Sequence, residues 1–213
     1  MLTAARTDNF HGFQLIKVAE AQFPTQYGLF RVFGFEGRCG DAAEEALALK
    51  MGDLGATAAK APLVRIHSQC LTGDVFHSLR CDCRAQLEMA LRSIAEEGCG
   101  LLIYELQEGR GIGLLNKLRA YELQDLGADT VEANRQLGFQ SDLRSYGLPG
   151  AILQYFGLTQ IRLLSNNPEK VEAVERAGVR VAERLPCVAE VVGTREFYLR
   201  TKKQKMGHLL EGL

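Results

Sequence analysis

The sequence has no hydrophobic run long enough to cross a membrane or to form the core of a signal peptide. We therefore expect a cytoplasmic protein. It also has no excess of either charge, because 25 Lys and Arg residues oppose 26 Asp and Glu residues and leave a net charge of -1. No global field attracts nucleic acid or an acidic membrane, so any anionic ligand must be held by local charge.

The chain also lacks internal repeats and low-complexity linkers. Its 213 residues correspond to one domain, or to one domain with an appended lobe. Apolar residues make up 46% of the chain and charged residues 24%, which excludes a disordered or collagen-like protein and permits a sizeable core.

Hydrophobic periodicity predicts a β-rich first third, followed by alternating strands and helices. Asp82 and Asn167 are candidate helix N-caps, and Gly98 is a candidate stop signal. This order predicts an α/β fold, with a mixed β-sheet covered by helices on both faces. The expected strands cover residues 28–35, 46–51, 63–67, 101–104, 161–164 and 179–181, and the expected helices cover residues 82–98, 114–127 and 167–178.

Both ends of the chain are predicted to be less regular than the middle. Residues 1–20 show no clear period, so we expect a loose start that is partly disordered. Residues 195–205 carry five basic side chains against one acidic side chain, and this composition is typical of a flexible, solvated end.

Three of the six cysteines are spaced as a metal site would require. Cys81 and Cys83 are one residue apart before a predicted helix, and Cys70 precedes Cys81 by ten intervening residues. Three soft ligands suit zinc. The alternative is a pair of buried cysteines without a metal, but Arg80 and the other flanking charges make the segment too polar for an ordinary core.

The sequence leaves the fourth zinc ligand open. His67 and His77 are the nearby candidates, and Cys99 and Cys187 are distant ones. If none of them is the fourth ligand, a water molecule is. Cys-rich zinc sites with a bound water can hydrolyse a bond at a ring carbon.

A glycine-rich loop covers residues 108–113, between a predicted strand and a predicted helix. Glycine at every second position lets backbone N–H groups approach phosphate, and Arg110 adds a positive charge. The alternative is a tight turn that binds no ligand. Arg65, Arg144 and Lys170 each lie beside a predicted strand end or turn, so their convergence with Arg110 on a polyphosphate is a hypothesis.

Four segments together closely resemble the GTP cyclohydrolase II family of riboflavin biosynthesis. They are residues 65–74 (RIHSQCLTGD), 78–83 (SLRCDC), 107–117 (QEGRGIGLLNK) and 165–168 (SNNP). The resemblance runs in a consistent order from about residue 18 through residues 205–210 (KMGHLL). It therefore implies a GTP cyclohydrolase II domain over residues 18–213, with residues 1–17 as an N-terminal extension.

The resemblance implies a zinc ion on Cys70, Cys81 and Cys83, where activated water hydrolyses C8 of guanine and releases formate. It also implies removal of diphosphate with the help of Mg2+. Arg144 then falls at the family's nucleophile and Asp142 at its proton acceptor, although without the family this pair is an ordinary surface salt bridge. Tyr121 falls at the family's catalytic tyrosine, and alone it is an aromatic residue on the buried face of a helix.

The resemblance further implies a set of contacts to GTP. Glu108 could read the N–H edge of guanine, while Lys170 and the arginines neutralise phosphate. The implied GTP contacts are Arg65, Ile66, His67, Ser68, Gln69, Gln86, Glu108, Gly109, Arg110, Thr130, Ser165 and Lys170.

Two positions depart from the family pattern near the expected zinc. Gln69 stands where the family often has Glu, and Arg84 follows the cysteine pair where glycine is common. Arg84 could offset the thiolate charge, or it could crowd the helix start and alter the substrate or the rate. Ser165 replaces a threonine but keeps the hydroxyl group.

We therefore expect an enzyme that converts GTP and water into 2,5-diamino-6-(5-phospho-D-ribosylamino)pyrimidin-4(3H)-one, formate and diphosphate. The resemblance implies a homodimer with no nucleic-acid or membrane partner. Family relatives sometimes carry a dihydroxybutanone phosphate synthase domain ahead of this one, and we expect that activity to be absent. The alternatives are a divergent paralogue that stops at the formylated intermediate and a non-catalytic zinc protein that binds nucleotide as a regulator.

Overall fold

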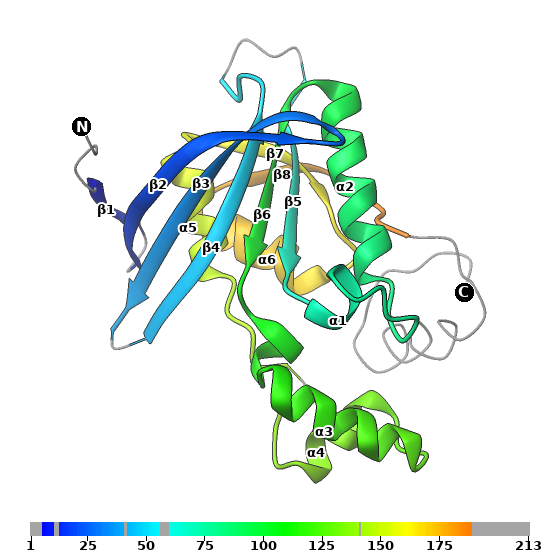
Figure 1. The fold of residues 1–213 in the computed structure, drawn as a ribbon. Coiled ribbons are helices and arrows are strands. Elements are labelled where there is room, and N and C mark those ends of the chain that lie inside the picture. Colours follow the sequence, from blue (N-terminus) through cyan, green and yellow to red (C-terminus); the bar gives the residue numbers. More distant parts are fainter. Residues whose placement is uncertain (1–5, 11–12, 41, 56–59, 141, 189–213) are drawn as a thin grey trace.

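The computed structural model describes residues 6–10, 13–40, 42–55, 60–140 and 142–188. These residues form one eight-stranded sheet with the order β1-β2-β3-β4-β6-β5-β7-β8 (Figure 1). The strands are β1 (Arg6–Phe10), β2 (Phe13–Thr25), β3 (Gly28–Cys39), β4 (Ala42–Met51), β5 (Leu63–Ser68), β6 (Gly100–Glu105), β7 (Gln160–Leu164) and β8 (Arg180–Leu185). The helices are α1 (Leu71–Asp74), α2 (Cys83–Glu97), the 3-10 turn η1 (Glu108–Gly111), α3 (Leu114–Asp125), α4 (Thr130–Gln136), α5 (Gly147–Tyr155) and α6 (Pro168–Arg176).

The sheet has an antiparallel half and a parallel half. Strands β1 to β4 pair antiparallel in sequence order, and β4 also pairs antiparallel with β6. Strands β6, β5, β7 and β8 pair parallel. The parallel strand β5 is buried along nearly its whole length, as expected for a strand that is covered on both faces.

Helices cover both faces of the sheet, which confirms the predicted fold class (Figure 1). On one face, α2 packs Ala90 and Ile94 against a cluster that includes Leu63. On the other face, α5 and α6 contribute Ile152 and Val174 to the larger hydrophobic cluster. None of the helices in the described residues is long and apolar enough to span a membrane.

The helix boundaries follow the signals in the sequence closely. Gly98 ends α2 with φ of 67°, a left-handed conformation that glycine adopts without strain. Asn167 caps α6 by accepting a hydrogen bond from the Glu169 N–H, and Pro168 occupies the first helical position. The predicted helices at 82–98 and 167–178 are therefore confirmed.

The expectation of a loose start at residues 1–20 is wrong for the described residues, because β1 and most of β2 lie there. Most β2 side chains are exposed, so the strand has no clear apolar alternation, and its pairing with β3 supplies the order instead. Leu15 is buried in the core. Residues 195–205 lie outside the described part of the chain.

Three helices were not predicted from the sequence, namely the four-residue α1, α4 and α5. α4 begins with a capping box in which Asp129 and Glu132 bond each other's backbone N–H groups. α5 contains Gly147, Pro149 and Gly150, which are poor helix formers. However, every residue of α5 from Leu148 to Leu153 is buried. Burial against the sheet therefore outweighs local propensity in α5.

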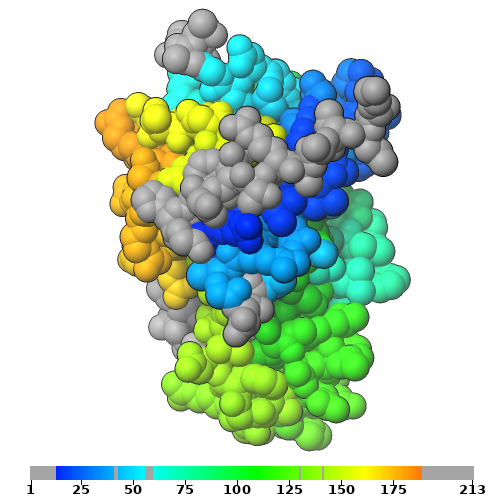
Figure 2. All heavy atoms as spheres, turned by 90° about the vertical axis from the view of Figure 1, so that its left-hand side faces the viewer, coloured from blue at the N-terminus to red at the C-terminus, as the bar shows by residue number. Residues whose placement is uncertain are grey.

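The order of the parallel strands along the sheet changes direction at β5, and a binding crevice is expected at such a switch point. From β5 the chain crosses through α2 to β6 on one side, and β7 lies on the other side of β5. The carboxyl ends of β5 and β6 both point toward α1, η1 and α3 (Figure 1). Seen from the side of the N-terminal strands, the α3–α4 segment forms the lower end of the molecule (Figure 2).

Candidate active site and metal centre

A cavity at the carboxyl ends of β5, β6 and β7 gathers most of the predicted site residues. Three parts of the chain far apart in sequence meet here because the parallel strands end at the same edge of the sheet. The predicted residues that line the cavity are Arg65, His67, Ser68, Gln69, Cys70, Cys81, Cys83, Gln86, Glu108, Gly109, Arg110, Tyr121, Arg144, Ser165 and Lys170.

Three predicted site residues do not line this cavity. The Ile66 side chain lies in the core on the other side of β5, and its carbonyl oxygen accepts a hydrogen bond from Lys170. Asp142 lines a neighbouring cavity, and Arg144 lines both cavities. Thr130 is the first residue of α4, and its side chain lies outside the described part of the structure.

The three predicted zinc ligands form one cluster. Cys70 lies at the N-terminal end of α1, Cys81 lies before α2, and Cys83 is the first residue of α2. Their three sulfur atoms lie within 4.8 Å of one another, and the Sγ atoms of Cys70 and Cys81 are 3.6 Å apart. Among the described residues, no histidine or carboxylate joins this cluster.

Of the four candidates for a fourth ligand, His77 is exposed and does not join the cluster, and the other three have different partners. His67 Nε2 lies 3.3 Å from the Asp74 carboxylate. The thiols of Cys99 and Cys187 donate to the carbonyl oxygens of Asp53 and Gln86, respectively. The donor set that the described residues offer is therefore three thiols, which suits zinc with one position left for water or substrate.

A glycine makes the sulfur cluster possible. A Cβ atom at Gly73 would lie 2.7 Å from Cys81 Sγ and 3.2 Å from Cys70 Sγ, so only glycine leaves these sulfur atoms room to converge. The thiols, their spacing and this space together fit a metal ion of the zinc type.

We expect Gly73→Ala to lower zinc affinity by about tenfold or more, because the added methyl group displaces Cys81 Sγ. Competition with a coloured chelator measures this affinity. Gly34→Ala is the matched control, since a Cβ there meets no atom closer than 3.9 Å. Equal zinc affinity for wild type and Gly73→Ala would show that the cluster does not depend on this space.

The thiols share protons unequally. Hydrogen bonds from the thiols of Cys81 and Cys83, with the nearby charge of Lys117, lower the pKa of Cys70. The pKa of Cys81 rises to about 11, because its thiol donates to Cys70. A metal bound to the cluster would replace the thiol protons.

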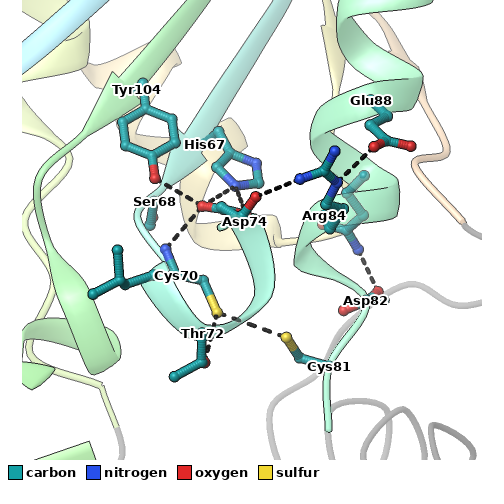
Figure 3. Close-up of polar contacts among 12 residues, drawn as sticks. His67, Ser68, Cys70, Thr72, Asp74, Cys81, Asp82, Arg84, Glu88 and Tyr104 are labelled. Atoms are coloured by element: carbon teal, nitrogen blue, oxygen red, sulfur yellow. Dashed lines mark hydrogen bonds and ion pairs between the residues drawn. The ribbon is translucent and has the colours of Figure 1, made fainter. Parts of the chain in front are cut away.

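Asp74 orders the segment that carries Cys70 (Figure 3). Its carboxylate accepts hydrogen bonds from the Tyr104 hydroxyl at 2.7 Å and from the Cys70 N–H at 3.0 Å, and His67 lies beside it. Burial lowers the pKa of His67, so its imidazole is neutral. Sequence reasoning missed Asp74 as a site residue, although it closes the motif at 65–74.

Arg84 does not donate to the thiols. Its guanidinium donates to the Asp74 carbonyl oxygen at 2.8 Å and to Glu88 at 2.6 Å (Figure 3). Arg84 therefore joins the end of α1 to the first turns of α2 without crowding the cysteine cluster.

Glu108 is held by three donors. Its carboxylate accepts hydrogen bonds from the Leu71 N–H at 2.6 Å, the Gly109 N–H at 2.7 Å and Lys117 Nζ at 2.8 Å. The glycine-rich loop, α1 and α3 are thereby joined at one wall of the cavity. Its predicted contact with guanine stays a prediction.

The glycine-rich loop carries backbone strain at a residue that faces the cavity. Arg110 has φ of 61°, which is unusual for a residue other than glycine, and its Nη1 atom is buried without a partner among the described residues. Gly111 lies against Leu143, where a Cβ would meet the Leu143 Cβ at 3.0 Å. This close approach brings the loop beside the segment that leads into Arg144.

Asp142 and Arg144 form a largely buried ion pair. The Arg144 guanidinium donates to both carboxylate oxygens of Asp142, at 2.9 Å from Nε and 2.5 Å from Nη2. Their side chains are 12% and 13% exposed, so the alternative of a surface salt bridge does not describe them. Although burial opposes it, hydrogen bonding to Arg144 lowers the pKa of Asp142.

A basic patch of Arg65, Arg144 and Lys170 lines the same cavity. Arg144 and Lys170 both donate to the Ser68 hydroxyl, at 3.3 and 3.2 Å, and Ser68 donates to the buried Glu105 at 3.0 Å. The Tyr146 ring faces both cations, 5.5 Å from Arg144 Cζ and 5.2 Å from Lys170 Nζ. Sequence reasoning missed Glu105 and Tyr146, whose roles depend on contacts across the fold.

Burial disfavours the charged form of Lys170. It lowers the pKa of Lys170 to about 7, while the charge of Glu105 acts in the opposite direction. A polyphosphate bound beside Lys170 would add negative charge and favour the ammonium form. Arg65 lies in the same cavity and is buried, with hydrogen bonds to Gln86 and to the Leu164 carbonyl oxygen.

Tyr121 reaches the cysteine cluster from α3. Its hydroxyl lies 3.2 Å from the Thr72 hydroxyl on α1. Arg80 Cζ lies 4.7 Å from the centre of its ring. Tyr121 therefore lines the cavity, as the resemblance implies, and is not an ordinary core aromatic.

Comparisons with known proteins agree with this geometry. The family model described as GTP cyclohydrolase II matches residues 16–186. GTP cyclohydrolase-2 of Yersinia pseudotuberculosis is 54% identical over 197 residues, which cover 92% of this chain and 98% of that protein. GTP cyclohydrolase-2 of Azotobacter vinelandii is 51% identical over 199 residues, which cover 93% and 94%.

A solved structure gives a much weaker likeness. It is a two domain 3,4-dihydroxy-2-butanone 4-phosphate synthase from A. baumannii, with 17% identity and a TM-score of 0.45. The match covers 83% of this chain and 40% of that chain. This likeness is too distant to bear on the fold or the function.

Proposed function

This chain belongs to the GTP cyclohydrolase II family, and we propose that it hydrolyses GTP to 2,5-diamino-6-(5-phospho-D-ribosylamino)pyrimidin-4(3H)-one, formate and diphosphate. As a member of that family it is a hydrolase of riboflavin biosynthesis. The observation that carries the fuller proposal is one cavity that holds a three-thiol cluster, a basic patch and the Asp142–Arg144 pair beside it.

Cys70, Cys81 and Cys83 would hold the zinc ion. Zinc bound there supplies a Lewis acid that makes water a stronger nucleophile toward C8 of the guanine ring. The guanine base would occupy the cavity that these cysteines and Tyr121 line, where the Tyr121 hydroxyl is held near α1 by Thr72. The Asp74 carboxylate accepts from the Cys70 N–H and so fixes the backbone of Cys70, and the neutral His67 lies beside that carboxylate.

The basic patch supports binding of the triphosphate. Arg65, Arg144 and Lys170 supply positive charge to the cavity, and Ser68 joins two of them. Cations that are fixed and partly desolvated bind phosphate more strongly than exposed ones. Mg2+ would accompany the polyphosphate, as the resemblance implies.

We assign Arg144 as the nucleophile that releases diphosphate and Asp142 as its proton acceptor. Asp142 already accepts hydrogen bonds from Nε and Nη2 of Arg144, so it is in reach of the proton that attack would release. Burial is the largest single effect on Arg144 and opposes its charge, but the hydrogen bond to Asp142 and the charges of Asp142, Tyr146 and Glu105 together raise its pKa. Attack by an Arg144 nitrogen on the α-phosphorus would form an N–P bond, break the bond to the β-phosphate so that diphosphate leaves, and pass a proton to Asp142. Water would then hydrolyse the N–P bond and leave the 5-phosphate of the product.

Two other functions would use the same cavity. A paralogue that stops at the formylated intermediate and a zinc-dependent nucleotide regulator both require only part of this chemistry. The buried Asp142–Arg144 pair and the position of Tyr121 favour the complete reaction over either one. Separate assays of formate and diphosphate from purified protein with GTP, Zn2+ and Mg2+ distinguish the three.

We expect one zinc ion per chain, lost when any of Cys70, Cys81 or Cys83 is changed to Ser, because each supplies one of three ligands. Elemental analysis after dialysis measures the zinc content. Cys99→Ser and Cys187→Ser are the controls, since both thiols bond carbonyl oxygens outside the cluster. A loss of zinc from a control as large as that from Cys81→Ser would contradict the assignment.

A further inference from the structure

A lysine on another helix reaches the cysteine cluster. Lys117 Nζ on α3 lies 3.2 Å from Cys70 Sγ and 2.8 Å from Glu108 Oε1, and its side chain is 12% exposed. Lys117 closes the motif at 107–117, but the resemblance assigns it no role. In the part of the chain that the structure describes, it is the one cation that donates a hydrogen bond to a thiol of the cluster.

The position of Lys117 is fixed by its surroundings. Glu108, which accepts from Lys117, also accepts from the backbone of Leu71 and Gly109. Leu71 directly follows Cys70, so the same carboxylate holds both the lysine and the cysteine segment. Arg84 and Arg80, two other nearby cations, bond carboxylates instead, at Glu88 and Asp125 respectively.

A zinc ion on three thiolates has a formal charge of -1, and thiolates donate strongly to the metal. Both effects make zinc a weaker Lewis acid than it is on three histidines. A hydrogen bond from an ammonium group stabilises the sulfur lone pairs and reduces their donation. Lys117 supplies such a bond and also a compensating charge.

We propose that Lys117 is a positioning residue that tunes the metal through Cys70, so that a three-thiolate zinc keeps enough Lewis acidity to promote attack on the ring. This inference rests on the proposed function, because it takes the thiol cluster to be the metal site. This role does not require Lys117 to contact the substrate, so a spectroscopic property of the bound metal ion can test it.

Cobalt substitution tests the inference without relying on activity. In full-length protein loaded with Co2+, Lys117→Met should move the thiolate-to-cobalt charge-transfer band to lower energy, because the sulfur electrons are held less tightly. Cobalt content per chain should stay near that of wild type. With Zn2+, the kcat for formate release should fall about tenfold or more, while the KM for GTP changes less than about twofold.

Matched variants separate tuning from simple packing. Lys117→Arg keeps both charge and donor, so its band should stay close to that of wild type. Lys117→Gln keeps a neutral donor and should give an intermediate shift, and it replaces the Met variant if that one does not fold. Arg119→Met on the same helix removes an exposed arginine that bonds Asn116, and it should leave the band unchanged.

The outcomes distinguish this inference from the proposed function. If Lys117→Met and Lys117→Gln bind cobalt with the wild-type band, the tuning role is wrong while the function stands. If the band shifts but wild type does not hydrolyse GTP, the role of Lys117 stands and the proposed function fails. If wild type shows no thiolate-to-cobalt band, the metal site and this inference are both wrong.

Discussion

Arg144→Ala is expected to lose turnover of GTP by at least about three orders of magnitude, a loss on the scale of removing a nucleophile. The guanidinium lies on the wall between two cavities and donates to both oxygens of Asp142 and to Ser68. Its removal therefore takes away the attacking group and one cation of the phosphate site. Steady-state formation of diphosphate measures the loss.

Arg144→Lys and Arg92→Ala make this test specific. Lysine keeps a positive charge near Ser68 but lacks the planar group that donates twice to Asp142. We expect Arg144→Lys to recover GTP binding with little turnover. Arg92 is exposed on α2, and its removal changes the net charge equally without touching the cavity. Similar losses for Arg144→Ala and Arg92→Ala would indicate a general charge effect.

The parallel half of the sheet could be predicted from the sequence because local signals and tertiary packing agree there. Asn167 and Pro168 begin α6, Gly98 ends α2, and β5 is a short apolar segment that the fold buries. The N-terminal strands could not be predicted in the same way. β2 is held by pairing with β3 over almost its whole length, and pairing across strands leaves little trace in single-sequence periodicity.

The candidate site likewise has a part that could be predicted from the sequence and a part that could not. The cysteine spacing is local, so the cluster could be predicted from Cys81 and Cys83 with Cys70 nearby. Glu105, Tyr146 and the bond from Lys117 to Cys70 are long-range, since each brings together side chains from separate elements. No spacing rule identifies such contacts, because they exist only once β5, β6 and α3 are in place.

The second largest effect that we expect is the loss of formate release in the Cys81→Ser variant. The substrate has two scissile regions, and the cavity offers different groups to each. The thiol cluster lies beside α1 and α2, whereas Arg144 and Lys170 both donate to the hydroxyl of Ser68 on β5. A zinc ligand should therefore be needed for ring opening and not for release of diphosphate.

We expect Cys81→Ser to lose formate release by about three orders of magnitude and to keep measurable diphosphate release, because Asp142 and Arg144 do not depend on the thiols. Cys39→Ser, a change at an exposed cysteine outside the cavity, should retain both activities. Formate and diphosphate are assayed from the same reaction, with GTP binding and circular dichroism as checks on folding. If both products vanish together while the protein stays folded and binds GTP, ring opening must precede or gate attack by Arg144, and the division of labour between the two groups of residues is wrong.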